Sequence, residues 1–152
     1  MAQALRLPNF GVQRILRREQ EYNGRQWSPV KSLQSPAWLK ETYDRITSLA
    51  DLKENWDSYG GLPVAPKAIS RARFLLSNLD VEDMPRPHVA AIPDGGVGLH
   101  WRVADRDLEV EVEANGDVHF LRTNAGKEPK SVDVHSWSGA QAVLDWVLGK
   151  RI

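Results

Sequence analysis

The sequence predicts an α+β fold with two N-terminal helices, a four-stranded antiparallel meander and a C-terminal helix. Two observations carry this prediction. Apolar residues recur at helical spacing between residues 35 and 79 and again after Ser138, but they alternate with polar residues between 88 and 120. Short turn signals rich in Gly, Asp and Asn separate the alternating runs, as they do in antiparallel hairpins.

The first helix is expected directly after Ser35-Pro36, because serine is a favoured N-cap and proline is tolerated at the first helical position. The second helix is expected to start at Pro66, after a turn rich in glycine and proline. Each helix has one apolar face, formed in the first by Leu39, Tyr43, Ile46, Leu49 and Ala50 and in the second by Ile69, Ala72, Leu76 and Leu79.

Four strands follow. Residues 88–92 and 98–103 flank the turn Asp94-Gly95-Gly96, and residues 108–113 alternate without error. The Asn115-Gly116 turn precedes the fourth strand, in which Val118 and Phe120 share a face. Residues 132–134 are a candidate short edge strand, and a final amphipathic helix runs from Ser138 to Gly149.

The expected register brings a polar row together on one face of the sheet. With Asp105-Arg106 as the loop, His100 lies opposite Glu111, and a three-residue loop over 114–116 sets Glu111 opposite His119. The row of His100, Glu111 and His119 has the ligand types of an iron(II) or zinc site. The alternative, which we favour, is a polar ladder of cross-strand pairs on a solvated face.

Charge is distributed unevenly along a chain whose formal net charge is zero. Residues 1–34 carry six basic and two acidic residues, whereas residues 80–128 carry five basic and eleven acidic residues. We expect residues 1–34 to form a basic N-terminal arm and residues 35–152 to form a single α+β domain. The arm either packs against the acidic segment of its own chain or contacts a partner. Its candidate partner-binding residues are Arg14, Arg17, Arg18, Tyr22, Arg25 and Trp27.

A second candidate recognition element is the turn between the two predicted helices. Trp56, Asp57 and Tyr59 crowd a glycine turn, and Trp and Tyr dominate the energetics of many interfaces. The alternative is that the aromatic residues cap the core while Asp57 accepts hydrogen bonds from turn amides.

Several functional classes are excluded or disfavoured. The chain has no cysteine, which excludes disulfides, thiolate zinc sites and a cysteine nucleophile. It has no GxSxG, GxxxxGK[ST] or GxGxxG motif, and we expect neither an enzyme nor a cofactor. No apolar run is long enough to span a membrane and the N-terminus lacks a continuous apolar core, so we expect a cytoplasmic protein.

Three ordered motifs carry a resemblance to a known family. LKENWDSYGGLPVAPKAISRARFLLSNL, PDGGVGLHW and LEVEVEANGDVHFL span roughly residues 40–123. Together they resemble a family of small, functionally uncharacterised bacterial proteins with an NWDxYG turn, a PDGGxxLxW hairpin and a LEIEI-like strand. The chain departs from that pattern at Ser58, where glycine is commoner, and at His100, where an acidic residue is usual, which weakens the metal hypothesis.

The resemblance implies an accessory protein of mobile or defence-type loci. With the missing catalytic motifs and the basic arm, it leads to the hypothesis of a non-catalytic protein, such as an antitoxin, immunity or defence component, that binds a protein partner through its arm. The alternatives are a metal-dependent enzyme at the His/Glu/His row, a nucleic-acid-binding module using the basic arm, and self-association through the arm.

Overall fold

The computed structural model describes residues 35–150. Their elements are α3 (Trp38–Ser48), the 3-10 helix η1 (Leu49–Asp51), α4 (Pro66–Asn78), β1 (His88–Ile92), β2 (Gly96–Val103), β3 (Arg106–Val112), β4 (Val118–Asn124), β5 (Lys130–Val132) and α5 (Trp137–Val147). The α+β class with an antiparallel sheet is confirmed. The sheet has five strands rather than the expected four, because residues 130–132 pair with β4.

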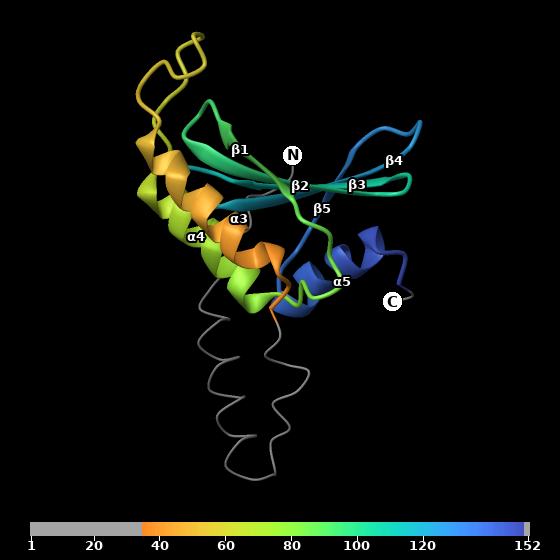
Figure 1. Ribbon diagram of the computed structural model, residues 1–152. Coiled ribbons are helices and arrows are strands. Elements are labelled where there is room, and N and C mark those ends of the chain that lie inside the picture. The colour runs from red at the N-terminus through yellow and green to blue at the C-terminus, as the bar shows by residue number, and fades with distance from the viewer. Residues whose placement is uncertain (1–34, 151–152) are drawn as a thin grey trace, which may run out of the picture.

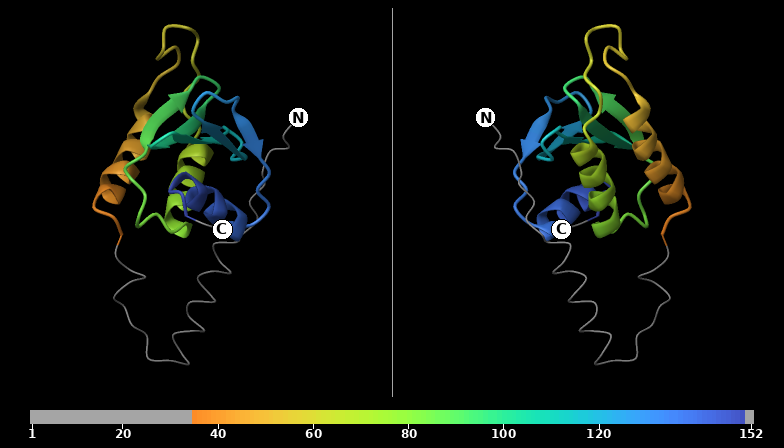
Figure 2. Two further views of the ribbon diagram at one scale, coloured as in Figure 1. Left: turned by 90° about the vertical axis from the view of Figure 1, so that its right-hand side faces the viewer. Right: turned by 90° about the vertical axis from the view of Figure 1, so that its left-hand side faces the viewer.

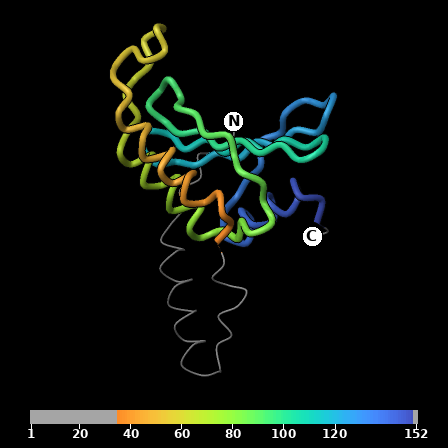
Figure 3. Tube along the Cα trace, in the orientation of Figure 1, coloured from red at the N-terminus to blue at the C-terminus, as the bar shows by residue number. Residues whose placement is uncertain are grey.

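The helices and the sheet form two layers. The strands lie in the order β1-β2-β3-β4-β5, and the described α-helices α3, α4 and α5 lie on one side of them (Figures 1 and 2). Helix α3 runs beside the edge strand β1, α4 crosses beneath the middle of the sheet, and α5 lies beneath β3 (Figure 2). The tube trace shows the segment between α3 and α4 projecting beyond the sheet (Figure 3).

The ends of the helices follow capping chemistry, with one correction. Helix α4 begins at Pro66 as expected, and Ser136 caps α5 by accepting a hydrogen bond from the amide of Gly139. Helix α3 begins at Trp38, and no side chain caps it, so the expected cap at Ser35 is wrong. Instead, the amide of Leu39 donates to the carbonyl of Pro36, which tightens the chain into a turn before the helix.

The β2–β3 hairpin differs from the expected register by two residues. Val103 pairs with Arg106, so the loop is Ala104-Asp105 rather than Asp105-Arg106. A shift of two keeps every side chain on its face, so the apolar pattern fits both registers equally well. The β3–β4 hairpin has the expected register: Val112 pairs with Val118, and Gly116 supplies the positive φ of 91° that the three-residue loop requires.

The core lies between the sheet and the helices. Its largest fully buried side chain is Trp101 of β2, and the same cluster contains aliphatic side chains from α3, α4 and α5. Two tryptophans also fix the segment that leads into β1. The Nε1 of Trp38 donates to the carbonyl of Met84 at 2.8 Å, and the Nε1 of Trp101 donates to the carbonyl of Pro85 at 2.9 Å.

Candidate functional site

The segment NWDSYGG, residues 55–61, forms a closed loop between η1 and α4. The amide of Asn55 donates to the carbonyl of Gly61 at 2.7 Å, which joins the two ends of the loop. Asn55 and Ser58 have positive φ angles of 64° and 65°. Such angles are uncommon for residues other than glycine, and at serine they cost on the order of 1 kcal/mol. The rest of the loop must therefore hold this conformation.

Side chains inside the loop supply that support. Asp57 Oδ1 accepts hydrogen bonds from the amides of Tyr59 at 2.9 Å and Gly61 at 2.8 Å. These bonds, the one from Tyr59 first, stabilise the ionised carboxylate and lower the pKa of Asp57 below its ordinary value. Asn55 Oδ1 accepts from the amide of Gly60 at 2.8 Å. The expectation that Asp57 binds turn amides is confirmed.

Trp56 also faces the loop rather than solvent. Its Nε1 donates to the carbonyl of Leu62 at 2.9 Å, and the side chain is half-buried. A Cβ added at Gly61 would lie 2.7 Å from Asp57 Oδ1 and 2.9 Å from Trp56 Nε1. Only glycine therefore fits at position 61 without displacing the two side chains that organise the loop.

The loop is fastened to the sheet by the second motif, Pro93-Asp94-Gly95-Gly96. The amide of Leu62 donates to the carbonyl of Pro93 at 2.8 Å, and the amide of Ala65 donates to the carbonyl of Gly95 at 2.9 Å. The NWDSYGG and PDGG motifs, which are 32 or more residues apart in the sequence, are thus parts of one structural unit. The link runs through Leu62 and Ala65, which follow the NWDSYGG motif and donate to carbonyls of the PDGG turn.

Tyr59 is the part of this unit that faces solvent. Its side chain is 93% exposed, and Leu62 follows at 49%. Within residues 35–150 these are the exposed large hydrophobic residues. Of the three residues expected in a recognition loop, Trp56 and Asp57 thus build the loop and Tyr59 is presented by it. The alternative in which both aromatic residues cap the core does not fit Tyr59.

The polar row on the outer face of the sheet is only partly assembled. Glu111 lies opposite His119 as expected, but His100 lies opposite Glu109, and Gly98 lies opposite Glu111. Each histidine instead contacts a diagonal carboxylate: His100 Nε2 is 2.8 Å from Asp107 Oδ1, and His119 Nε2 is 3.0 Å from Glu113 Oε1. Among residues 35–150, no group of three or more His, Asp or Glu side chains is placed to hold a metal ion.

The six arm residues singled out in the sequence, Arg14, Arg17, Arg18, Tyr22, Arg25 and Trp27, lie outside the described residues.

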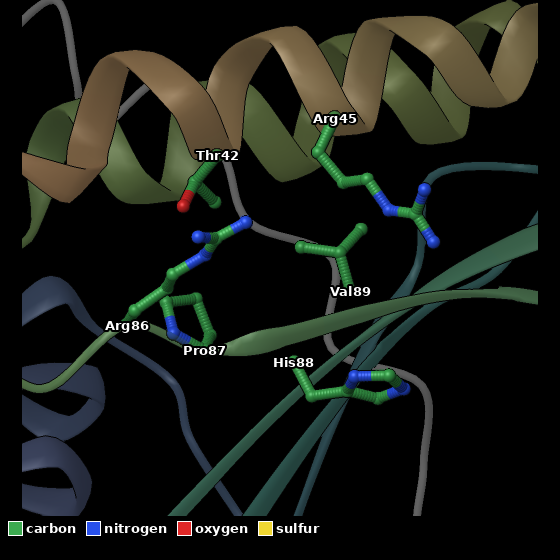
Figure 4. A pocket seen from close by; sticks show the side chains of 6 residues that line it. All are labelled: Thr42, Arg45, Arg86, Pro87, His88 and Val89. Carbon is green, nitrogen blue, oxygen red and sulfur yellow. The ribbon is translucent and has the colours of Figure 1, made fainter.

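Sequence reasoning missed a groove between α3 and β1. The groove has a volume of about 330 Å³ and is lined by Thr42, Arg45, Arg86, Pro87, His88 and Val89 (Figure 4). One signal for it was present in the sequence. Thr42 lies three residues after Leu39 and four before Ile46, so it places a hydroxyl within the buried face of α3.

Comparison of the chain with protein-family models, with curated proteins and with solved structures finds no match. In the described part of the chain, no helix is both long and apolar enough to cross a membrane. A function must therefore be argued from the loop, the groove and the sequence pattern.

Proposed function

We propose that this protein is a non-catalytic partner-binding protein, and that the loop of residues 55–61 and the N-terminal arm together bind a protein partner. The observation that carries the proposal is the exposure of Tyr59 on a loop whose conformation is fixed by its own hydrogen bonds. The resemblance to accessory proteins of defence-type loci supports an antitoxin or immunity role in the cytoplasm.

The energetics of the loop support recognition rather than stability. A tyrosine that is 93% exposed buries little surface, so it adds little to the folding free energy. The positive φ of Ser58 costs free energy instead. A tyrosine on a rigid loop offers a large contact surface whose ordering cost has been met before the partner arrives.

The arm adds positive charge, which the loop of residues 55–61 lacks. Residues 1–34 carry an excess of four positive charges, which favours a partner with an acidic surface. An arm of this composition that binds along a partner surface would complement the single aromatic contact of the loop.

The test is affinity purification of the tagged full-length chain from its native cells. Wild type is compared with Tyr59→Ala, with a chain lacking residues 1–34, and with Lys53→Ala as a matched control, because Lys53 is exposed and just precedes the loop. We expect wild type and Lys53→Ala to recover the same stoichiometric partner. Tyr59→Ala is expected to weaken the complex about 30-fold, the effect of losing a hot-spot side chain worth about 2 kcal/mol.

Either half of the proposal can fail separately. Unchanged affinity of Tyr59→Ala would remove the loop from the interface, and unchanged affinity without residues 1–34 would remove the arm. Light scattering on the pure protein completes the test. If the pure protein forms a defined oligomer and recovers no other protein, the partner is a second copy of the chain rather than a different protein.

A further inference from the structure

The groove between α3 and β1 is distinct from the recognition loop. It is lined from one side by Thr42 and Arg45 of α3 and from the other by residues 86–89, at the start of β1. The segment that follows the NWDSYGG loop is instead bonded, through Leu62 and Ala65, to Pro93 and Gly95 beyond the other end of β1. A volume of about 330 Å³ lies within the range of small-ligand sites.

The charged side chains that line the groove are all basic. Arg45 and Arg86 contribute two guanidinium groups, and among residues 35–150 no carboxylate lines the groove. Within residues 35–150, Arg45 makes no ion pair. Arg86 pairs with Glu41 at 3.2 Å, but both side chains are more than half exposed, so this pair is easily exchanged for a better anionic partner.

A buried hydroxyl faces the same space. Thr42 is 1% exposed, and its Oγ1 has no hydrogen-bond partner within the described part of the chain. Figure 4 shows this oxygen on the groove side of α3. A buried polar group without a partner is costly, and valine would occupy the same volume without that cost. The hydroxyl is therefore a donor that the fold itself leaves unused.

The groove is also rigid where Arg86 enters it. Pro85 and Pro87 flank Arg86, and the indole groups of Trp38 and Trp101 hold the carbonyls of Met84 and Pro85. Arg45 is fixed on the last turn of α3, where a basic residue also suits the helix dipole. A favourable interaction with a helix dipole cannot account for Arg86, because Arg86 lies outside any helix.

From these observations we infer that the groove binds the phosphate group of a small phosphorylated molecule. Guanidinium groups bind phosphate oxygens with paired N–H donors. A phosphate monoester at pH 7 carries a charge of about −1.5 to −2, which balances the two positive charges of the arginines better than the single negative charge of a carboxylate does. The Thr42 hydroxyl supplies a further donor, while Val89 and Pro87 offer an apolar wall to the rest of the ligand. Binding displaces Glu41 from Arg86 into solvent. The N-terminal arm is itself basic and so does not fit this groove.

The test is a titration of the ¹⁵N-labelled full-length chain with inorganic phosphate, phenyl phosphate and benzoate, in a buffer free of other multivalent anions. We expect saturable shifts at the amides of Thr42, Arg45 and Val89, with phenyl phosphate binding more tightly than inorganic phosphate and benzoate more weakly. Arg45→Gln and Arg86→Gln should each weaken binding about tenfold or more, because each removes a charged hydrogen-bond donor.

Two further variants separate a binding site from a folding effect. Lys40→Gln removes a positive charge from an exposed position on the same helix outside the groove, and it should leave the affinity unchanged. Glu41→Gln frees Arg86 from its competing carboxylate and should increase the affinity, a gain that damage to the fold cannot produce. Thr42→Val should weaken binding while the protein stays folded.

The proposal is overturned if the shifts do not saturate, if they fall outside the groove, or if Lys40→Gln lowers the affinity as much as Arg45→Gln. Preference for benzoate over phenyl phosphate would overturn the assignment to phosphate. None of these readouts depends on the protein partner, so the failure of the phosphate site and the failure of the partner-binding proposal are separate results.

Discussion

At the scale of single residues, Asp57 shows how a carboxylate fixes a loop. Its pKa is lowered from 3.8 by amide donors, first Tyr59 and then Gly61. A lowered pKa in the folded state means that the ionised form stabilises the loop at neutral pH, and that this contribution is lost as the pH falls through the folded pKa. We therefore expect the loop to lose order only below pH 3.8.

The measurement is the pH dependence of backbone amide shifts. The amide of Gly61 should titrate with a midpoint below 3.8, because its acceptor is Asp57 Oδ1. The amide of Gly60 is the internal control, because its acceptor is the side-chain oxygen of Asn55, which does not ionise. A midpoint for Gly61 at or above the ordinary aspartate value would contradict the hydrogen-bonded arrangement.

The hydroxyl of Thr42 is expected to lower the stability of the fold while it contributes to the proposed ligand site. Replacing a buried hydroxyl that has no partner by a methyl group of similar size removes a desolvation cost. Thr42→Val should therefore raise the free energy of unfolding by about 1 kcal/mol in the absence of ligand. Denaturant unfolding measures this change.

The matched control for Thr42→Val is Thr47→Val on the same helix. The hydroxyl of Thr47 accepts a hydrogen bond from Arg73 at 3.1 Å, so its loss is expected to be neutral or slightly destabilising. Both substitutions keep a β-branched side chain, so helix propensity does not separate them. A Thr42→Val protein less stable than wild type would show that this hydroxyl has a partner within the fold.

At the scale of elements, Arg106 connects the β2–β3 hairpin, in its observed register, to helix α5. With the loop at Ala104-Asp105, Arg106 lies on the inner face of β3. Its guanidinium stacks 5.3 Å from the Trp146 ring centre and donates to the carbonyl of Trp146, near the end of α5. Arg122 lies 5.4 Å from the same ring, so two strands and the last helix meet there.

Arg106→Gln is expected to destabilise the fold by about 1–2 kcal/mol, because it removes a stacked cation and a partly buried charged donor. Thermal unfolding provides the measurement. Arg102→Gln, in the same hairpin, is the control: its side chain is 73% exposed and its ion pair with Asp107 is worth less than about 1 kcal/mol. Equal effects of the two substitutions would mean that the Arg106–Trp146 contact does not anchor α5.

The same hairpin shows how far sequence reasoning reaches. Alternation in residues 108–113 identified the strand and its apolar face, because period two is set by the backbone itself. It did not identify the register, since a shift of two preserves that face, and contacts that accompany the observed register, such as that of Arg106 with a distant helix, cannot be read from the alternation. The His100–Glu111 pair was therefore wrong. Glu111 and His119 were placed correctly because a two-residue Asn115-Gly116 loop would shift the register by one and put Val118 and Phe120 on the polar face, so the apolar pattern selects the three-residue loop.

At the scale of the whole molecule, the candidate site formed by neighbouring residues was predicted from the sequence, whereas the one formed by distant residues was not. The NWDSYGG loop was found because glycine, aspartate and tryptophan in a turn are a local signal. The groove was not found, because Arg45 and Arg86 line one groove only when α3 packs beside the edge of the sheet. A basic residue on a helix and another between two prolines have no relation in the sequence that predicts this contact.

The domain boundary is the last prediction at this scale. The hydrophobic core draws on all three described α-helices and on all strands except β5, whose Val132 packs against it. No residue before Leu39 belongs to this buried set within the described part of the chain. We therefore expect residues 35–152 to fold without the N-terminal arm and to unfold in one cooperative transition, as single domains of this size do.

Thermal unfolding followed by near-ultraviolet circular dichroism tests this expectation, because the signal reports the packing of Trp101 and the other core aromatics. The fragment of residues 35–152 should keep the near-ultraviolet spectrum of its buried tryptophans and unfold within a few degrees of the full chain. If the arm instead packs against the acidic segment over residues 80–128, its removal leaves that negative charge uncompensated. The fragment would then be less stable than the full chain at low salt, and added salt would narrow the difference. That result would make the arm a structural part of the domain and would remove it from the proposed partner interface.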